Sequence, residues 1–223
     1  MDNRDALKKW GILAYIAISL LSFTVILCIP ATREGFGSLS ANHPFPMGFL
    51  KFAVLATAGE LIAAYIATGK PSLPPKIVAR FLIWGVIGVW ITLMMKVYSA
   101  AAVSLMASGL LPGGDSTFLR ALYTSVLMNT TFGPTFMAVH KISDTFLELR
   151  AKGEGAGLST VMKTVDWSRF AGFTILKTVP LFWIPAHTVT FLLPAQYQVI
   201  MAAALSVVLG IILSLGNRKK TKK

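Results

Sequence analysis

Long apolar segments separated by short polar ones are the dominant pattern along this chain. About 20 consecutive apolar residues cross a bilayer as a helix, and runs of roughly that length recur. We therefore expect an all-α fold, a polytopic transmembrane helix bundle forming a single domain over residues 1–223. The six expected spans are 10–30, 47–68, 78–110, 118–139, 170–184 and 196–215.

The polar segments between these runs contain the residue types that end helices. Residues 31–46 and 111–116 are rich in turn formers and predict loops. The segment 69–75, with its Gly and Pro residues, predicts a clear helix stop. Residues 158–167 predict a short helix that lies in the membrane interface, because apolar residues share one side of it and Trp167 ends it.

Three of the apolar runs have irregular features. The run 78–110 is longer as a helix than the bilayer core, so it must tilt, kink or project beyond the membrane. Gly133-Pro134 interrupts the fourth run and predicts a kink or hinge there. The Pro-rich segment from Trp183 to Pro194 predicts a packed, re-entrant-like corner on the outer side.

Composition excludes most other classes of protein. Hydrophobic residues make up 55% of the chain and charged residues only 13%, about half the charged share of a soluble domain. These values exclude a soluble globule, a disordered chain and a collagen, and leave an integral membrane protein. Cys28 is the only cysteine, so no internal disulfide forms.

Lysine and arginine alternate between loops in a way that predicts topology. They gather at the amino terminus, after the second run, after the fourth run and in the tail, whereas the alternate loops hold few. Basic loops face the cytoplasm, so both termini are expected on that side of what we take to be a bacterial cytoplasmic membrane. The net charge of +12 is then explained by topology and by attraction to anionic lipid headgroups. Nucleic-acid binding is not expected, because the sequence lacks a basic domain with aromatic platforms.

Three ionisable residues fall inside expected spans, namely Glu60, Lys96 and Lys177. Burying one costs roughly 2.5–3.5 kcal/mol on insertion scales, so such residues normally face the bundle interior or a watery cavity. Glu60 and Lys177 are expected at similar depth and could pair, Lys96 would line the outer half, and polar Asn129 lies nearby in the fourth run. The alternatives are a purely structural pair, a protonated Glu60 and a Lys96 that snorkels outward.

Catalytic and metal-binding motifs are not evident. The sequence has no HExxH and no Cys/His pair suited to zinc, so we expect no metal, no cofactor and no enzyme. His140 and Asp144 are four residues apart on one expected helix face, which suits an acid–base site or a structural hydrogen bond. An intramembrane enzyme that uses Glu60, or His140 with Asp144, is the least favoured alternative.

Several short motifs occur once each, in a fixed order, along the chain. They are His43-Pro44, Gly59-Glu60, Arg120, Gly133-Pro134, Lys141, Asp144, Trp183-x-Pro185-Ala186-His187, Thr190-Phe191 and Pro194. In this order the chain resembles the Mpv/Pmp-type peroxisomal and mitochondrial inner-membrane proteins over about residues 42–214. It differs by an extra first span, by one extra span between Glu60 and Arg120, and by Glu60 and His187 in place of the family's Asp and Gln.

The resemblance implies a helical membrane protein linked to the passage of small solutes. Together with the intramembrane charges, it leads to the hypothesis of a narrow polar pathway or cavity for a small solute or ion. Glu60 would then set cation preference or take part in proton coupling. A structural or accessory membrane protein without transport is the alternative, and a homo-oligomer stays open.

Overall fold

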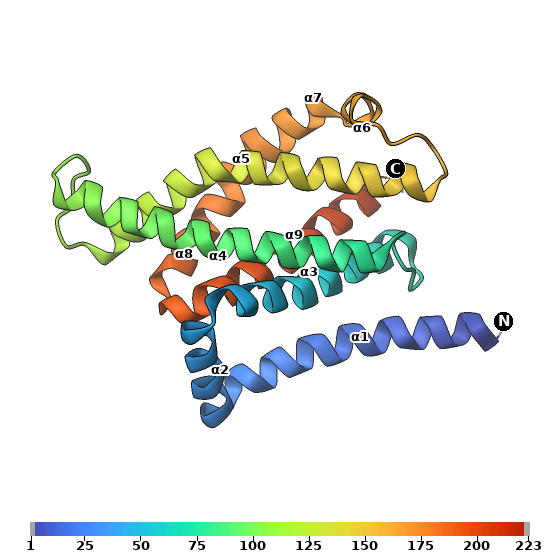
Figure 1. The fold of residues 1–223 in the computed structure, drawn as a ribbon, viewed down its shortest axis with the longest axis horizontal. Coiled ribbons are helices and arrows are strands. Elements are labelled where there is room, and N and C mark those ends of the chain that lie inside the picture. Colours follow the sequence, from blue (N-terminus) through green and yellow to red (C-terminus); the bar gives the residue numbers. More distant parts are fainter. Residues whose placement is uncertain (1–2, 221–223) are drawn as a thin grey trace. The chain divides into compact units, whose positions relative to one another are not determined.

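The computed structural model describes residues 3–220, and all of the regular structure in this range is helical (Figure 1). Five helical segments in it are long and apolar enough to cross a membrane. The protein is therefore an integral, multi-pass membrane protein with an all-α fold. The five segments are Ala6–Cys28, Pro44–Thr68, Ile77–Ala107, Trp167–Leu192 and Ala195–Ile212.

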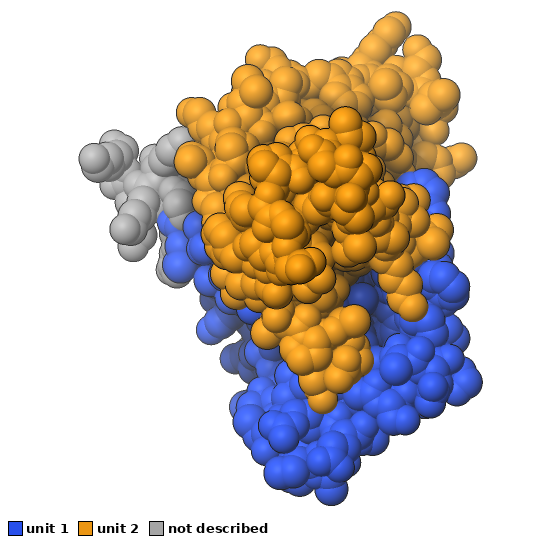
Figure 2. Space-filling view, turned by 90° about the vertical axis from the view of Figure 1, so that its left-hand side faces the viewer, with its two compact units in different colours: residues 1–92, 199–223 blue, residues 93–198 orange. Residues whose placement is uncertain are grey.

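The chain forms two compact units, which Figure 2 colours separately. The first unit comprises residues 1–92 and 199–223, and the second comprises residues 93–198. Helix α4 (Ile77–Ala107) contributes its first part to the first unit and its second part to the second. Each unit is described by itself below.

The first unit begins with α1 (Asn3–Cys28), α2 (Pro30–Asn42) and α3 (Pro44–Thr68). The loop expected at residues 31–46 is wrong, because α2 occupies most of it. Pro30 and Pro44 each stand at the start of a helix, where a missing N–H costs nothing. The residue before proline is kept out of the α region, so the helices break only at Ile29 and His43, which have non-helical backbone angles.

Small residues let the helices of the first unit approach closely. A Cβ on Gly88 of α4 would overlap the Gly48 carbonyl of α3. A Cβ on Gly59 of α3 would lie 3.1 Å from Val207 of α9 (Ala195–Lys220). Without an apolar driving force between helices in lipid, such close packing supplies much of the association energy.

The second unit contains α5 (Thr117–Ala151), α6 (Leu158–Thr164), α7 (Trp167–Arg169), the π-helix η1 (Phe170–Trp183) and α8 (Ile184–Leu192). Helix α5 packs against α6, η1 and α8. It begins at Ser116, whose hydroxyl accepts a hydrogen bond from the Leu119 N–H at 3.3 Å, as an N-cap does. The predicted loop at 111–116 and the helix stop at 69–75 are both confirmed.

Two sequence expectations differ from the structure of this unit. The expected fourth span, 118–139, lies within α5, which is not among the five segments apolar enough to cross a membrane. Polar side chains such as Ser125 and Asn129 lower the mean hydropathy of α5. The count of six spans stays a prediction. The expected corner from Trp183 to Pro194 is wrong over most of its length, because α8 continues to Leu192 and the chain turns only at extended Leu193, before Pro194.

Candidate functional site

In the first unit, Glu60 is held by two residues of α4. The Trp84 Nε1–H donates to Glu60 Oε1 at 2.8 Å, and Arg80 Nη1 lies 3.5 Å from the same carboxylate. Arg80 is 7% exposed and also donates from Nε to the Pro75 carbonyl at 3.1 Å. A charged donor and an indole N–H thus satisfy a carboxylate that is only 17% exposed.

Lys177, the partner expected for Glu60, belongs to the other unit and its side chain is exposed. Arg80 takes the role because the short segment after α3 brings α4 back beside it. Arg80 is one of the basic residues that follow the second apolar run. With α4 starting at Ile77, it lies inside the helix, one turn from Trp84, so both face Glu60.

Lys96 of α4 is exposed as well, as is Lys177 of η1. The expectation that both lysines face the bundle interior or a watery cavity stays a prediction. A lysine has a long aliphatic stem that lies along an apolar surface while the ammonium reaches outward, so it need not face the bundle interior. The interpretation of Lys96 as a snorkelling residue fits this exposure.

Sequence reasoning missed a buried cation, Lys51, which lies near the start of α3. Its side chain is only 2% exposed, and its Nζ lies 4.8 Å from the centre of the Phe36 ring. A cation over an aromatic face is favourable, more so when desolvated. No signal in the sequence could have found this contact while residues 31–46 were taken for a loop.

In the second unit, a buried polar network joins α5 to α8. The His187 Nδ1 and Asn129 Oδ1 atoms lie 3.0 Å apart. The Asn129 amide donates to the Ser125 carbonyl at 2.8 Å, and the Ser125 hydroxyl donates to the Ile184 carbonyl at 2.8 Å. All three side chains are buried. Such networks are costly at membrane depth unless each member is satisfied, and here each makes a hydrogen bond across or along the helices.

Two aromatic rings pack against His187 of this network. The Trp183 ring packs on the His187 ring with a 5.1 Å separation of centroids, and Phe191 meets His187 edge-on at 6.4 Å. The Trp183 Nε1 atom is buried and has no hydrogen-bond partner in the described part of the chain. The sequence had singled out Trp183, Asn129 and His187 separately, and the structure brings them together.

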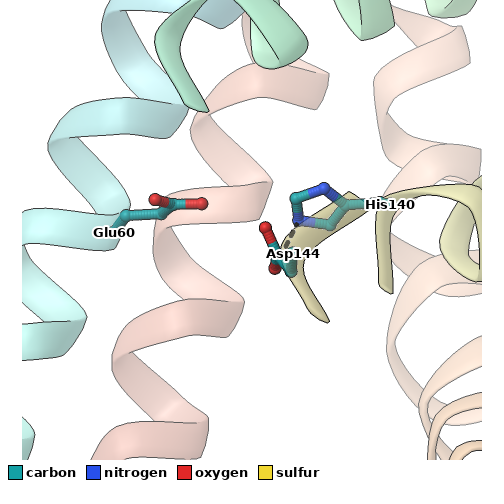
Figure 3. Close-up of side chains that lie close together, drawn as sticks. All are labelled: Glu60, His140 and Asp144. Atoms are coloured by element: carbon teal, nitrogen blue, oxygen red, sulfur yellow. Dashed lines mark ion pairs between the residues drawn. The ribbon is translucent and has the colours of Figure 1, made fainter. Parts of the chain in front are cut away.

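Further along α5, His140 and Asp144 form the expected contact of residues one turn apart. His140 Nε2 lies 3.5 Å from Asp144 Oδ2, and Figure 3 draws this contact as a dashed line. Both side chains are partly buried, and Phe136 stacks on the His140 ring. The contact accords with a structural hydrogen bond and equally offers an imidazole and a carboxylate on one helix face.

The remaining motif residues lie where they shape helices rather than meet in one place. Pro44 and Pro185 occupy the first positions of helices, and Pro194 follows the turn after α8. Gly133 and Pro134 lie inside α5, which continues through them. Exposed positions are held by His43, Arg120 and Lys141.

No family model, curated protein or solved structure matches the chain.

Proposed function

We propose that the protein forms a polar pathway for small solutes or ions through a bacterial cytoplasmic membrane, with α5 as its polar lining. The observation that carries the proposal is the position of α5 in the second unit. This helix packs along η1 and α8, which together with α7 form the candidate span Trp167–Leu192. Its polar residues thus lie beside a segment suited to cross the hydrocarbon core.

The polarity of α5 extends over more than one side of the helix. Ser125 and Asn129 are buried against α8, whereas Thr130, Thr131 and Thr135 are exposed within this structure. A helix with hydroxyls on such a face is poorly suited to lipid and well suited to water or to another protein surface. The hydrogen bonds to α8 account for the buried side, and a water-lined passage accounts for the exposed side.

A second candidate function rests on a different observation. Glu60 is engaged by Arg80 and Trp84. The exposed hydroxyls of α5 are engaged as well, because Thr130 donates to the Val126 carbonyl at 2.7 Å and Thr131 Oγ1 lies 2.6 Å from the Tyr98 hydroxyl of α4. Polar groups satisfied in this way can act purely as interhelical glue. An accessory membrane protein without transport is the function that this observation favours.

The remaining parts of the proposal come from the sequence. Kinship with the Mpv/Pmp-type proteins, six spans with both termini in the cytoplasm, and the absence of enzymatic activity agree with a pathway for solutes. The amino-terminal segment and the basic tail orient the chain in this proposal.

The test is flux through the purified protein in liposomes. After an osmotic step, neutral polyols should enter protein-containing vesicles faster than protein-free ones, as measured by light scattering. A parallel assay with a potential-sensitive dye reports flux of alkali cations.

A Thr130→Val, Thr135→Val double variant should slow this flux, because it replaces exposed hydroxyls of the proposed lining, each bonded only to its own helix, with methyl groups of similar size. Thr24→Val is the matched control, since Thr24 of α1 is also exposed and bonds to its own helix at the Leu20 carbonyl. Entry rates equal to those of empty vesicles for every solute and cation would refute the pathway and favour the accessory role.

A further inference from the structure

We infer that Trp183 and His187 together bind a hydroxyl group of a small neutral solute. The inference rests on the proposed function, because it names the class of solute that the pathway takes. It depends on the direction of each hydrogen bond in the network of the second unit.

The first step fixes the orientation of the Asn129 amide. The Ser125 carbonyl lies 2.8 Å from Asn129 Nδ2, and a carbonyl oxygen can only accept a hydrogen bond. The NH₂ group of Asn129 therefore points to Ser125, and its Oδ1 points to His187. The second contact of Nδ2, with the Ser125 hydroxyl oxygen at 3.2 Å, agrees with this orientation.

The second step fixes the tautomer of His187. Asn129 Oδ1 has no proton to give, so the hydrogen bond at 3.0 Å requires that His187 Nδ1 carries the proton. In a neutral imidazole the other nitrogen is then an acceptor. His187 Nε2 thus has a lone pair, and it has no hydrogen-bond partner among residues 3–220.

The third step adds the opposite type of atom one helical turn away. The Trp183 Nε1–H is a donor, it is buried, and it too lacks a partner among the described residues. The two rings pack on each other at 5.1 Å. A buried donor without an acceptor costs about 1–3 kcal/mol, so a group that accepts from the Trp183 Nε1–H recovers that cost.

The chemistry of these two atoms selects the solute. A hydroxyl donates and accepts hydrogen bonds, so it matches both the lone pair of Nε2 and the indole N–H. An anion would meet the lone pair of Nε2 and is disfavoured. A cation finds no carboxylate on the segment, because residues 167–192 contain no Asp or Glu. Phe191 and the two rings supply an apolar surface for the carbon skeleton of a polyol.

Nitrogen NMR of the histidines in detergent micelles tests the site without any flux measurement. The chain has three histidines, so ¹⁵N-histidine labelling and one His187→Gln sample assign the His187 signals. In the free protein we expect the Nδ1–H tautomer. Titration with glycerol should shift the Nε2 signal saturably, whereas dimethyl sulfoxide, which accepts but cannot donate, should not.

Trp183→Phe keeps a ring at this position and removes only the donor. It should weaken glycerol binding about tenfold, the factor expected for one hydrogen bond. Trp10→Phe, which removes an exposed indole from α1, should leave binding unchanged.

An Nε2–H tautomer, or glycerol shifts that do not saturate or that dimethyl sulfoxide reproduces, would overturn the inference. The two proposals fail separately. Saturable glycerol binding without flux supports the site and refutes the pathway, and flux without saturable binding refutes the site alone.

Discussion

Removing the charge of Glu60 and that of Arg80, singly and together, tests whether these residues stabilise the first unit as a pair. Arg80→Met leaves a carboxylate that is 17% exposed without its cation. Breaking a buried pair from one side costs about 3 kcal/mol, at the low end of the usual range because Glu60 is partly exposed. Glu60→Gln should cost about 2 kcal/mol, since the amide oxygen still accepts from Trp84 at the 2.8 Å position.

The double variant should lose only about 3 kcal/mol, because neither charge is left uncompensated. The coupling energy is then about 2 kcal/mol, within the range for residues in direct contact. SDS-induced unfolding in mixed micelles, followed by circular dichroism, measures each value. Glu34→Gln is the matched control, because Glu34 is exposed on α2, and it should change stability by less than about 0.5 kcal/mol. Losses that simply add would refute the pairing.

Three further predictions concern packing, capping and the buried network. Gly88→Ala should lower the free energy of unfolding by about 1–3 kcal/mol in SDS-induced unfolding, because its Cβ would overlap the backbone of α3. Gly11→Ala is the control and should not lower it, because the space around Gly11 is open. Ser116→Ala should cost about 1 kcal/mol and speed hydrogen exchange in the first turn of α5. Asn129→Leu should cost about 1–3 kcal/mol by leaving the His187 Nδ1–H without its acceptor, and an unchanged unfolding midpoint would contradict the network.

The sequence predicts the membrane-spanning class and most helix ends because these depend on local chemistry. Gly69 ends α3 in the left-handed conformation (φ 73°), as the glycine-proline segment indicates. The same local rules failed at residues 31–46, where turn formers were read as a loop. Pro30 and Pro44 there start helices instead of preventing them, and a helix of mixed polarity leaves no periodic apolar signal.

The partners of the polar residues could not be predicted in the same way. Glu60 could be recognised as costly in a membrane from its position alone, but its partner depends on the register between α3 and α4. That register is set by close approaches such as Gly48 to Gly88, which no local pattern encodes. The exposure of Lys96 and Lys177 likewise depends on which helix faces are covered.

The polar residues of α5 distinguish a solute pathway from an accessory role better than the charged residues Glu60, Lys96 and Lys177 do. At 35 residues, α5 is about 52 Å long, well beyond a hydrocarbon core of about 30 Å. With Asn129 beside the candidate span, its carboxyl-terminal turns extend past the core, and these carry Lys141 and Arg150, which water accepts at no cost. The turns that stay at depth are the ones that carry Thr130 and Thr135, whose hydroxyls bond only to their own helix. If protein alone covered this face, replacing both hydroxyls with methyl groups should stabilise the fold or leave it unchanged and alter no flux. If water covers it, the same replacement should make the lining less polar and slow solute flux. One double variant, measured for both stability and flux, therefore decides between the accessory role and the pathway.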